Sequence, residues 1–275
     1  MLERRLSWTN STPLLVVVSP AVLTLYVTPD RPNSNVLNRA HFVQFAAALW
    51  TVDFVLGLAG NGYTAAYLHT REPGISYNIF TYPNTSSASN TGWVTGPQYY
   101  SLLLLAETFS TKQTTSGGTV VVDLNLDNPA AVAGYAIYDV NALTAPPRNL
   151  VLFNFASDSS AQTFTLPSGL APSQKLNTYV RTLTASSLTE NNAAKITYAG
   201  QTVDGSGSLR GKLSEKKVTC QNGCDVEVPG PGIALVMLQA QKSSARRQRT
   251  AGFGSGGSVE LAVVICLGSL AGYLI

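Results

Sequence analysis

"TVVVDLNLDNPAAVAGYAIYDVNALTAPPRNLVLFNFA", residues 119 to 156, holds three apolar runs separated by short turns rich in Asn, Asp and Pro. Within the runs at 119–126 and 133–140, apolar and polar side chains tend to alternate, and this period of two is typical of β-strands. Similar runs follow at residues 161–167, 176–185, 193–200, 216–221 and 224–240. Eight short strands at this spacing predict an antiparallel β-sandwich, and the "PGPG" turn at 229–232 predicts a hairpin-like start to its last strand.

The segment before residue 118 has a different period. Apolar side chains recur there at three- and four-residue steps, at Phe42, Phe45, Leu49, Val52 and Leu56. This spacing predicts a buried helix, which "GNG" at 60–62 ends. "YTAAYLHT" at 63–70 then indicates a strand, and "GPQYYSLLLLAETFS" at 96–110 a second helix that begins at Pro97. The expected fold is therefore mainly β, with a helix, a strand and a helix before the sandwich.

Composition excludes two classes of protein. With 45% hydrophobic and 12% charged residues among 275, the chain suits a folded protein with a large core and not a disordered one. The net charge of +3 comes from the basic tail, because residues 6–241 carry 12 basic and 13 acidic side chains. A nucleic-acid-binding protein would need a basic face, so we expect no nucleic-acid partner.

The cysteines and two sequons indicate an extracellular protein. Cys220 and Cys224 bracket the tight turn "CQNGC", which predicts a disulfide. Two free thiols are the alternative, whereas a metal site is disfavoured because no second pair of cysteines or histidines completes a tetrahedron. Asn10 and Asn84 each begin an Asn-x-Ser/Thr glycosylation sequon, which agrees with secretion.

The C-terminal tail, residues 241–275, has the order of a glycolipid-anchor signal. Small residues including Ser243 and Ser244 come first, a polar spacer at 246–257 follows, and an apolar run ends the sequence. The run at 261–275 is shorter than the roughly 20 residues that a transmembrane helix needs. We expect an anchor attached near Ser243 or Ser244, with a marginal membrane span or a helix packed on the fold as alternatives.

The N-terminal segment, residues 1–38, is poorly defined. A basic start and the apolar run "PLLVVVSPAVLTLYV" at 13–27 resemble a signal peptide or signal anchor, but Pro20 interrupts the run and no small-x-small cleavage site follows. A fragment of buried strand explains the run equally well. Together with the tail, this segment leads us to expect a secreted or cell-surface protein that is glycolipid-anchored or otherwise membrane-associated.

Several segments together carry a resemblance to a known family. In order they are "AAALWTVDF", a strand ending in "LHT", "YNIFTYP", "GPQYYSLLLLAE", "YAIYDVN", "LVLFNFA", "KITYAGQTVD" and "VEVPGPGIALVML". From about Arg39 to Gln239 this order resembles the C-terminal part of fungal glycoside hydrolase family 79, the β-glucuronidase group. The resemblance implies that residues 39–112 are the last helix-strand-helix remnant of a (β/α)₈ catalytic barrel. It also implies that residues 118–240 are the C-terminal β-sandwich domain of the family.

The resemblance also suggests a substrate-binding loop. Loops after the strands of such a barrel form the active-site face, so His69, Gly74, Tyr77 and Asn78 are the candidate substrate-binding residues. In the family, a tyrosine of this loop helps to hold the carboxylate of the sugar, and Tyr77 with Gly74 matches it best. The alternative is that His69 only caps the strand and that Tyr77 packs against the sandwich. Trp50, Asp53, Tyr99, Tyr100 and Glu107 are expected to be structural.

The catalytic residues of the family have no counterpart in this sequence. Retaining glycosidases use two carboxylates about 5 to 5.5 Å apart. "WTNS" at 8–11 resembles the nucleophile motif of the family, but Trp8 stands in place of its glutamate, and no Asn-Glu dipeptide for the acid/base is present. We therefore assign no catalytic residue, metal or cofactor, and whether the chain is an enzyme stays open.

Two functions are compatible with these residues. The first is a truncated family 79-like protein that is related to carbohydrate, of glucuronide type, but does not catalyse hydrolysis. The second is a surface-anchored accessory protein that binds carbohydrate. The small number of tryptophans favours the first, since Trp93 is the only one after the first helix.

Overall fold

The structure is a computed structural model. It describes residues 15–19, 22–26, 44–70, 78–83, 92–110, 118–128, 131–143, 146–167, 176–220, 223–238 and 262–267. Strands and two α-helices account for most of the regular structure in these ranges, and the strands of the large sheet pair antiparallel. The predicted mainly β, antiparallel fold is confirmed.

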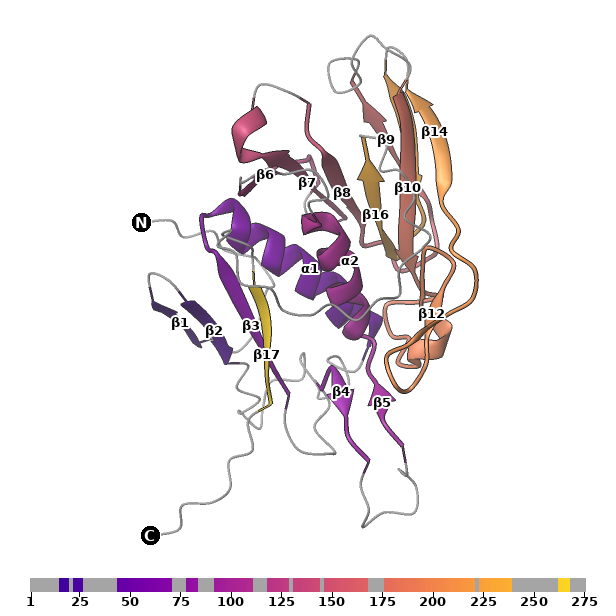
Figure 1. Cartoon of the computed structure of the whole chain (residues 1–275). Coiled ribbons are helices and arrows are strands. Elements are labelled where there is room, and N and C mark those ends of the chain that lie inside the picture. The colour runs from indigo at the N-terminus through magenta and orange to yellow at the C-terminus, as the bar shows by residue number, and fades with distance from the viewer. Residues whose placement is uncertain are drawn as a thin grey trace.

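The largest sheet of the described structure has seven strands and is antiparallel (Figure 1). Its order is β11-β10-β16-β8-β7-β6, and β14 pairs with β10 beside β11. The strands are β6 (Thr119–Asp123), β7 (Val132–Asp139), β8 (Asn149–Asn154), β10 (Leu176–Thr184), β11 (Thr197–Tyr198), β14 (Lys216–Cys220) and β16 (Gly232–Met237). The first and last predicted strands therefore lie far apart in the sequence but belong to one sheet.

The two central strands are apolar on both faces. In β8, Val151 and Phe153 belong to one core, whereas Leu150 and Leu152 belong to a second core on the other side of the sheet. Alternate side chains of β16 divide between the same two cores. Strands covered on both faces need such continuous apolar runs, so the sheet is the middle of three layers.

The helices α1 (Phe45–Gly60) and α2 (Tyr99–Phe109) form the layer on one face. Phe45, Val52 and Leu56 of α1 are 0% exposed and share a core with the sheet. As predicted, the helix ends at "GNG", where the side-chain amide of Asn61 donates to the carbonyl oxygen of Gly57 at 2.7 Å. Figure 1 shows both helices between the large sheet and a smaller one.

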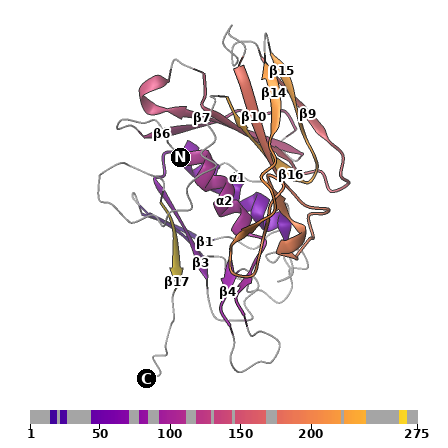
Figure 2. The same ribbon diagram turned by 45° about the vertical axis from the view of Figure 1, so that its right-hand side comes forward.

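The layer on the other face is the antiparallel pair of β9 (Gln162–Leu166) and β15 (Cys224–Val228) (Figure 2). Their buried residues Leu166, Val226 and Val228 join the second core. Strand β15 pairs with β9, whereas β16 pairs with β8 and β10. The "PGPG" turn between β15 and β16 therefore takes the chain from one layer to the next. The hairpin-like start predicted for β16 is not observed in this described segment.

The smaller sheet has the order β1-β2-β3-β17. Its strands are β1 (Leu15–Ser19), β2 (Val22–Tyr26), β3 (Ala65–Thr70) and β17 (Ala262–Leu267). Both β2 and β17 run parallel to β3. Part of each terminal apolar run therefore forms a strand, and the packed helix that was one alternative for the tail is not observed in the described residues.

Short elements complete the described structure. They are β4 (Phe80–Thr81), β5 (Val94–Thr95), β12 (Thr202–Val203), β13 (Leu209–Arg210) and the 3₁₀-helices η2 (Val140–Ala142) and η4 (Ala193–Lys195). The strand predicted over 193–200 is thus replaced by η4 and the two-residue strand β11.

Candidate functional site

The predicted substrate-binding loop begins where β3 ends. His69 lies in β3, and its backbone is in register with that of Cys266 in β17. The side chain of His69 lies outside the described residues, as do Gly74, Tyr77 and Glu72. The contacts of these residues with a sugar therefore remain predictions.

Asn78 is the predicted site residue whose surroundings are described. It is only 7% exposed, and its backbone carbonyl oxygen would lie 2.6 Å from a Cβ placed on Gly96. The next residue, Ile79, is 1% exposed and accepts a hydrogen bond from the Gly96 N–H at 2.9 Å. Asn78 thus lies at the closely packed base of the β4–β5 hairpin, where it has little surface to offer a ligand.

The β4–β5 hairpin projects past the ends of the helices (Figure 1). At its base, the ring of Phe80 packs on the ring of Tyr99 in α2, with the ring centroids 4.8 Å apart. The Tyr99 hydroxyl donates to the carbonyl oxygen of Gly207 at 3.2 Å. Farther out, Tyr82 is 46% exposed and Trp93 is 51% exposed. The hairpin therefore has a packed base and an open outer part that carries two aromatic side chains.

Residues 204–210, called the Asp204 turn here, pack against this hairpin. The Thr95 hydroxyl lies 2.9 Å from the carbonyl oxygens of both Asp204 and Gly205, and it can donate to either. A Cβ on Gly205 would lie 2.5 Å from the carbonyl oxygen of Trp93, so only glycine fits this contact. The sandwich and the hairpin are thereby joined through the Thr95 hydroxyl and through backbone atoms of both.

The Asp204 carboxylate organises the turn. Its Oδ1 accepts from the Ser206 N–H and hydroxyl at 3.0 and 2.7 Å and from the Ser208 N–H at 2.9 Å. Its Oδ2 accepts from Arg210 Nε at 2.8 Å. These hydrogen bonds lower the pKa of Asp204 to about 2. The hydrogen bond from Ser206 contributes most, and those from Ser208 and Arg210 follow. Near neutral pH this carboxylate is ionised, so it cannot serve as a proton donor.

A second polar cluster lies between α2 and the sheet. Arg181 of β10 donates to Glu107 Oε1 of α2 at 2.5 Å and to Glu215 Oε2 at 3.0 Å. The hydroxyl of Tyr198 in β11 donates to the other oxygen of Glu107. Burial, and next the negative charge of Glu107, raise the pKa of Tyr198 well above its usual value, so it stays protonated.

The geometry of this cluster does not suit glycoside cleavage. A retaining glycosidase needs one carboxylate free to attack the sugar and another that carries the proton for the leaving group. Here Glu107 and Glu215 both accept from the single guanidinium of Arg181. The cluster instead ties α2 to two strands, in agreement with the structural role expected for Glu107.

Other described carboxylates also have structural partners. Asp53 of α1 accepts from the hydroxyl of Tyr135 in β7 at 2.8 Å, and burial raises its pKa despite this hydrogen bond. Further pairs are Asp139 with Arg148 and Asp225 with Thr165, each at 2.8 Å. These contacts join separate parts of the fold.

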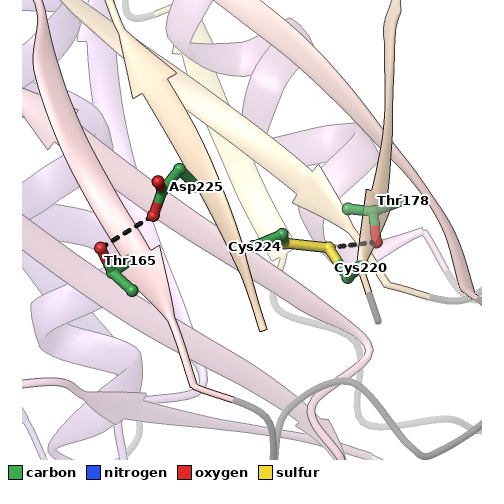
Figure 3. The surroundings of a disulfide bond; sticks show 5 residues. All are labelled: Thr165, Thr178, Cys220, Cys224 and Asp225. Atoms are coloured by element: carbon green, nitrogen blue, oxygen red, sulfur yellow. Dashed lines mark hydrogen bonds between the residues drawn. A yellow bond between two sulfur atoms is a disulfide. The ribbon is translucent and has the colours of Figure 1, made fainter. Parts of the chain in front are cut away.

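The disulfide predicted from "CQNGC" is formed by Cys220 and Cys224 (Figure 3). It joins the end of β14 to the start of β15, and Cys220 is fully buried. The Thr178 hydroxyl of β10 contacts Cys220 Sγ at 3.4 Å. The bond therefore links the large sheet to the pair that covers its outer face.

One family model covers the centre of the sandwich. Residues 134–235 match the model of the glycosyl hydrolase family 79 C-terminal beta domain. The predicted resemblance to family 79 is confirmed. The matched range runs from β7 to the middle of β16 and includes the Asp204 turn and the disulfide.

Solved structures of glycoside hydrolases resemble the chain over a longer range. A 4-O-α-L-rhamnosyl-β-D-glucuronidase from Fusarium oxysporum 12S matches with a TM-score of 0.57 and 20% identity, over 72% of this chain and 40% of that protein. An α-L-arabinofuranosidase from Thermotoga maritima matches with a TM-score of 0.42 and 11% identity, over 70% of this chain and 38% of the other. The chain thus spans about 40% of the length of the glucuronidase. No curated protein matches the chain.

Two further features are absent from the described part of the chain. No group of three or more His, Cys, Asp or Glu side chains there could hold a metal ion. No helix there is long and apolar enough to cross a membrane. The predicted sequons at Asn10 and Asn84, and the anchor residues Ser243 and Ser244, lie outside the described residues.

Sequence reasoning missed the features that surround the hairpin. The alternation of Asp, Ser and Gly in "DGSGS" at 204–208 was a usable signal, because an Asp side chain often bonds the backbone two residues on. The Arg181 cluster gave no such signal, since its hydrogen bonds join residues that are 34 to 91 positions apart in the sequence.

Proposed function

We propose that this chain is a family 79-like protein related to carbohydrate, and that it does not hydrolyse glycosides on its own. The family match over residues 134–235 carries the first part. The named activity of the Fusarium glucuronidase supports a glucuronide-type glycan as the related sugar. In this proposal, residues 39–112 are the last helix-strand-helix unit of a (β/α)₈ barrel that the sandwich supports.

The carboxylate chemistry supports the second part. Glycoside cleavage needs a proton donor at the leaving oxygen and a second carboxylate placed at a fixed distance from it. Glu107 and Glu215 are bound to one arginine, and Asp53 is bound to Tyr135. Asp204, which is next to the hairpin, is held ionised by its turn.

The loop after β3 has the role of holding a sugar in this proposal. Tyr77, with Gly74, would contact the sugar carboxylate, and His69 would orient the ring from the end of the strand. The parallel pairing of β3 with β2 supports this assignment, since ligands bind beyond the carboxyl ends of parallel strands. The burial of Asn78 makes it the weakest of the four candidates.

A chromogenic β-glucuronide assay on the purified chain tests the proposal. We expect no turnover above the uncatalysed rate. Glu72→Gln is the control, because Glu72 is the one carboxylate of the loop. Turnover by the chain that disappears in Glu72→Gln would refute the proposal and identify Glu72 as catalytic.

The second candidate function is a surface-anchored protein that binds carbohydrate without cleaving it. The exposure of Tyr82 and Trp93 on one hairpin favours it, because exposed aromatic side chains are typical of binding surfaces. The disulfide supports a secreted location, since such bonds persist in oxidising compartments.

The proposed anchor can be tested on cells that express the protein. With a glycolipid attached at Ser243 or Ser244, phosphatidylinositol-specific phospholipase C should release the protein into the medium. Retention after this treatment, with an intact C-terminal peptide in mass spectrometry, would exclude the anchor.

A further inference from the structure

Half of the exposed large hydrophobic side chains of the described residues lie on the β4–β5 hairpin or the turn beside it. Tyr82, Trp93 and Val94 lie on the hairpin, with Val94 on the opposite face from Thr95, and Leu209 lies on the Asp204 turn. The other four lie in β6, at η2 and after β13. Single exposed apolar side chains need no explanation, whereas a cluster of this kind marks a binding surface.

The two aromatic residues directly adjoin the paired strands. Phe80 pairs with Thr95, and Thr81 pairs with Val94. Tyr82 follows β4 and Trp93 precedes β5, so an extension of this register by one position would put both on the same face as Phe80 and Thr95. Cross-strand neighbours on one face are close enough for their side chains to act together.

The Asp204 turn covers the inner half of this face and leaves the outer half uncovered. Thr95 is 6% exposed because its hydroxyl contacts the turn. The cover stops at Trp93, whose carbonyl oxygen touches Gly205 but whose side chain is half exposed. The exposed Trp93 is thus bordered directly by a polar turn.

The border offers hydrogen-bonding groups in a fixed arrangement. The hydroxyls of Ser206 and Ser208 lie 3.2 Å apart, and Ser206 also contacts Asp204 Oδ1. The Arg210 side chain is 68% exposed, and its guanidinium is held by the Asp204 carboxylate. Aromatic area beside prearranged hydroxyl and guanidinium groups suits a ligand that has both a flat C–H face and many hydroxyls.

We infer that the outer face of the β4–β5 hairpin, with the Asp204 turn, is a glycan-binding platform on which Tyr82 and Trp93 stack against pyranose rings. Rings of this kind present C–H bonds on their faces and hydroxyls at their edges, and aromatic side chains give rigid contact area with little loss of entropy. A protein partner would not require the row of hydroxyls. This inference rests on the proposed carbohydrate-related function and adds a location for the sugar farther along the same connection from β3 to α2, beyond the predicted residues 69–78.

Binding of two oligosaccharides to the full chain tests this platform. The probes are cellohexaose, which is neutral, and a xylo-oligosaccharide that bears glucuronic acid, each titrated by calorimetry. The variants are Trp93→Ala, Tyr82→Ala and Trp93→Phe. Val94→Ala is the matched control, because Val94 is 49% exposed on the same hairpin but on the opposite face.

We expect the wild-type chain to bind at least one probe. Each alanine variant at Tyr82 or Trp93 should weaken binding about tenfold or more, as central aromatic contacts do. Trp93→Phe should retain most of the affinity, and Val94→Ala should retain all of it. Circular dichroism should show the same fold for all variants, since every substituted side chain is exposed.

Three results would overturn the inference. They are no binding of either probe by the wild-type chain, equal affinity in Trp93→Ala, or self-association of the wild-type chain that Trp93→Ala abolishes, which would assign the patch to a protein contact. The hydrolysis assay is independent of these results. Turnover of the glucuronide would refute the proposed lack of activity, whereas failure to bind either probe would refute only the platform.

Discussion

Replacing Tyr100 with phenylalanine removes one hydroxyl group from the buried joint between α2 and the sandwich. Tyr100 is 0% exposed. Its hydroxyl lies 2.7 Å from the carbonyl oxygens of Ala193 and Ile196, and it accepts from the Val203 N–H at 2.7 Å. The variant keeps the ring and its packing, so the change isolates these hydrogen bonds.

The expected loss of stability follows from the groups left behind. The Val203 N–H loses its acceptor in a position that is 2% exposed, and the two carbonyl oxygens lose the proton that they share. A buried polar group left unsatisfied costs about 1–3 kcal/mol. We expect Tyr100→Phe to lower the free energy of unfolding by about 3 kcal/mol. For a protein of this size, that corresponds to a fall in Tm of about 6–12 °C.

Urea unfolding followed by circular dichroism measures this loss. The adjacent tyrosine provides the control, because the Tyr99 hydroxyl makes one bond of 3.2 Å to Gly207 in a partly exposed position. Tyr99→Phe should therefore cost about 1 kcal/mol or less. A Tyr100→Phe variant within about 0.5 kcal/mol of the wild type would refute the reasoning, since surface substitutions reach that size.

Three further outcomes follow from the same contacts. The double variant Cys220→Ser, Cys224→Ser should lose about 2 kcal/mol of unfolding free energy in urea, because the disulfide closes a loop of about five residues. An unfolding free energy equal to that of the oxidised wild type would contradict this. Arg181→Gln should lose about 1–2 kcal/mol of unfolding free energy, since two partly exposed glutamates lose the cation that pairs with them. Glu227→Gln, on an exposed face, is the control and should change the unfolding free energy little. Burial raises the pKa of Tyr100 to about 12, above its value near 10 in the unfolded chain. The stability linked to this proton is complete below pH 10 and is lost as the pH rises toward 12, so the wild type should lose more stability than Tyr100→Phe over that range.

The sequence predicted the large sheet because its pattern has a direct physical cause. Strands β8 and β16 are buried at every position, and the four central residues of β8 and all of β16 carry no polar side chain, as their two buried faces require. The step of three and four residues from Phe45 to Leu56 likewise reflects the buried side of α1. Such patterns depend only on local spacing, so a single sequence is enough to show them.

The prediction failed where local hydrogen bonds compete with strand pairing. Residues 193–200 have the composition of a strand, but the Asn192 side chain accepts from the Ala194 N–H and begins a 3₁₀ turn. Ala199 and Gly200 then adopt positive φ angles of 49° and 75°, which end the strand after two residues. Strands as short as β4 and β5 contain no period that a sequence could show.

For the candidate site, contacts between residues close in the sequence could be predicted, whereas contacts between residues far apart in the sequence could not. The pairing of Cys220 with Cys224 follows from a spacing of four residues, whereas Arg181 meets Glu107 from 74 residues away. The proposed hairpin platform has the same limitation, because Trp93 meets Gly205 of the Asp204 turn from more than 100 residues away. The sequence shows Trp93, but the exposure of its side chain and its neighbours in the fold could not be predicted.

The hydrophobic core that the helices share with the large sheet bears on the proposed boundary between residues 39–112 and 118–240. A domain has its own hydrophobic core, yet Leu49 and Leu104 of the helices share one core with Phe153 and Leu235 of the sheet. The helices therefore cover a sheet face that would otherwise expose large apolar side chains. The family match begins at residue 134, after both helices. The matched β domain accordingly depends on the preceding segment for its cover, which is the physical reason to expect that the two segments fold together.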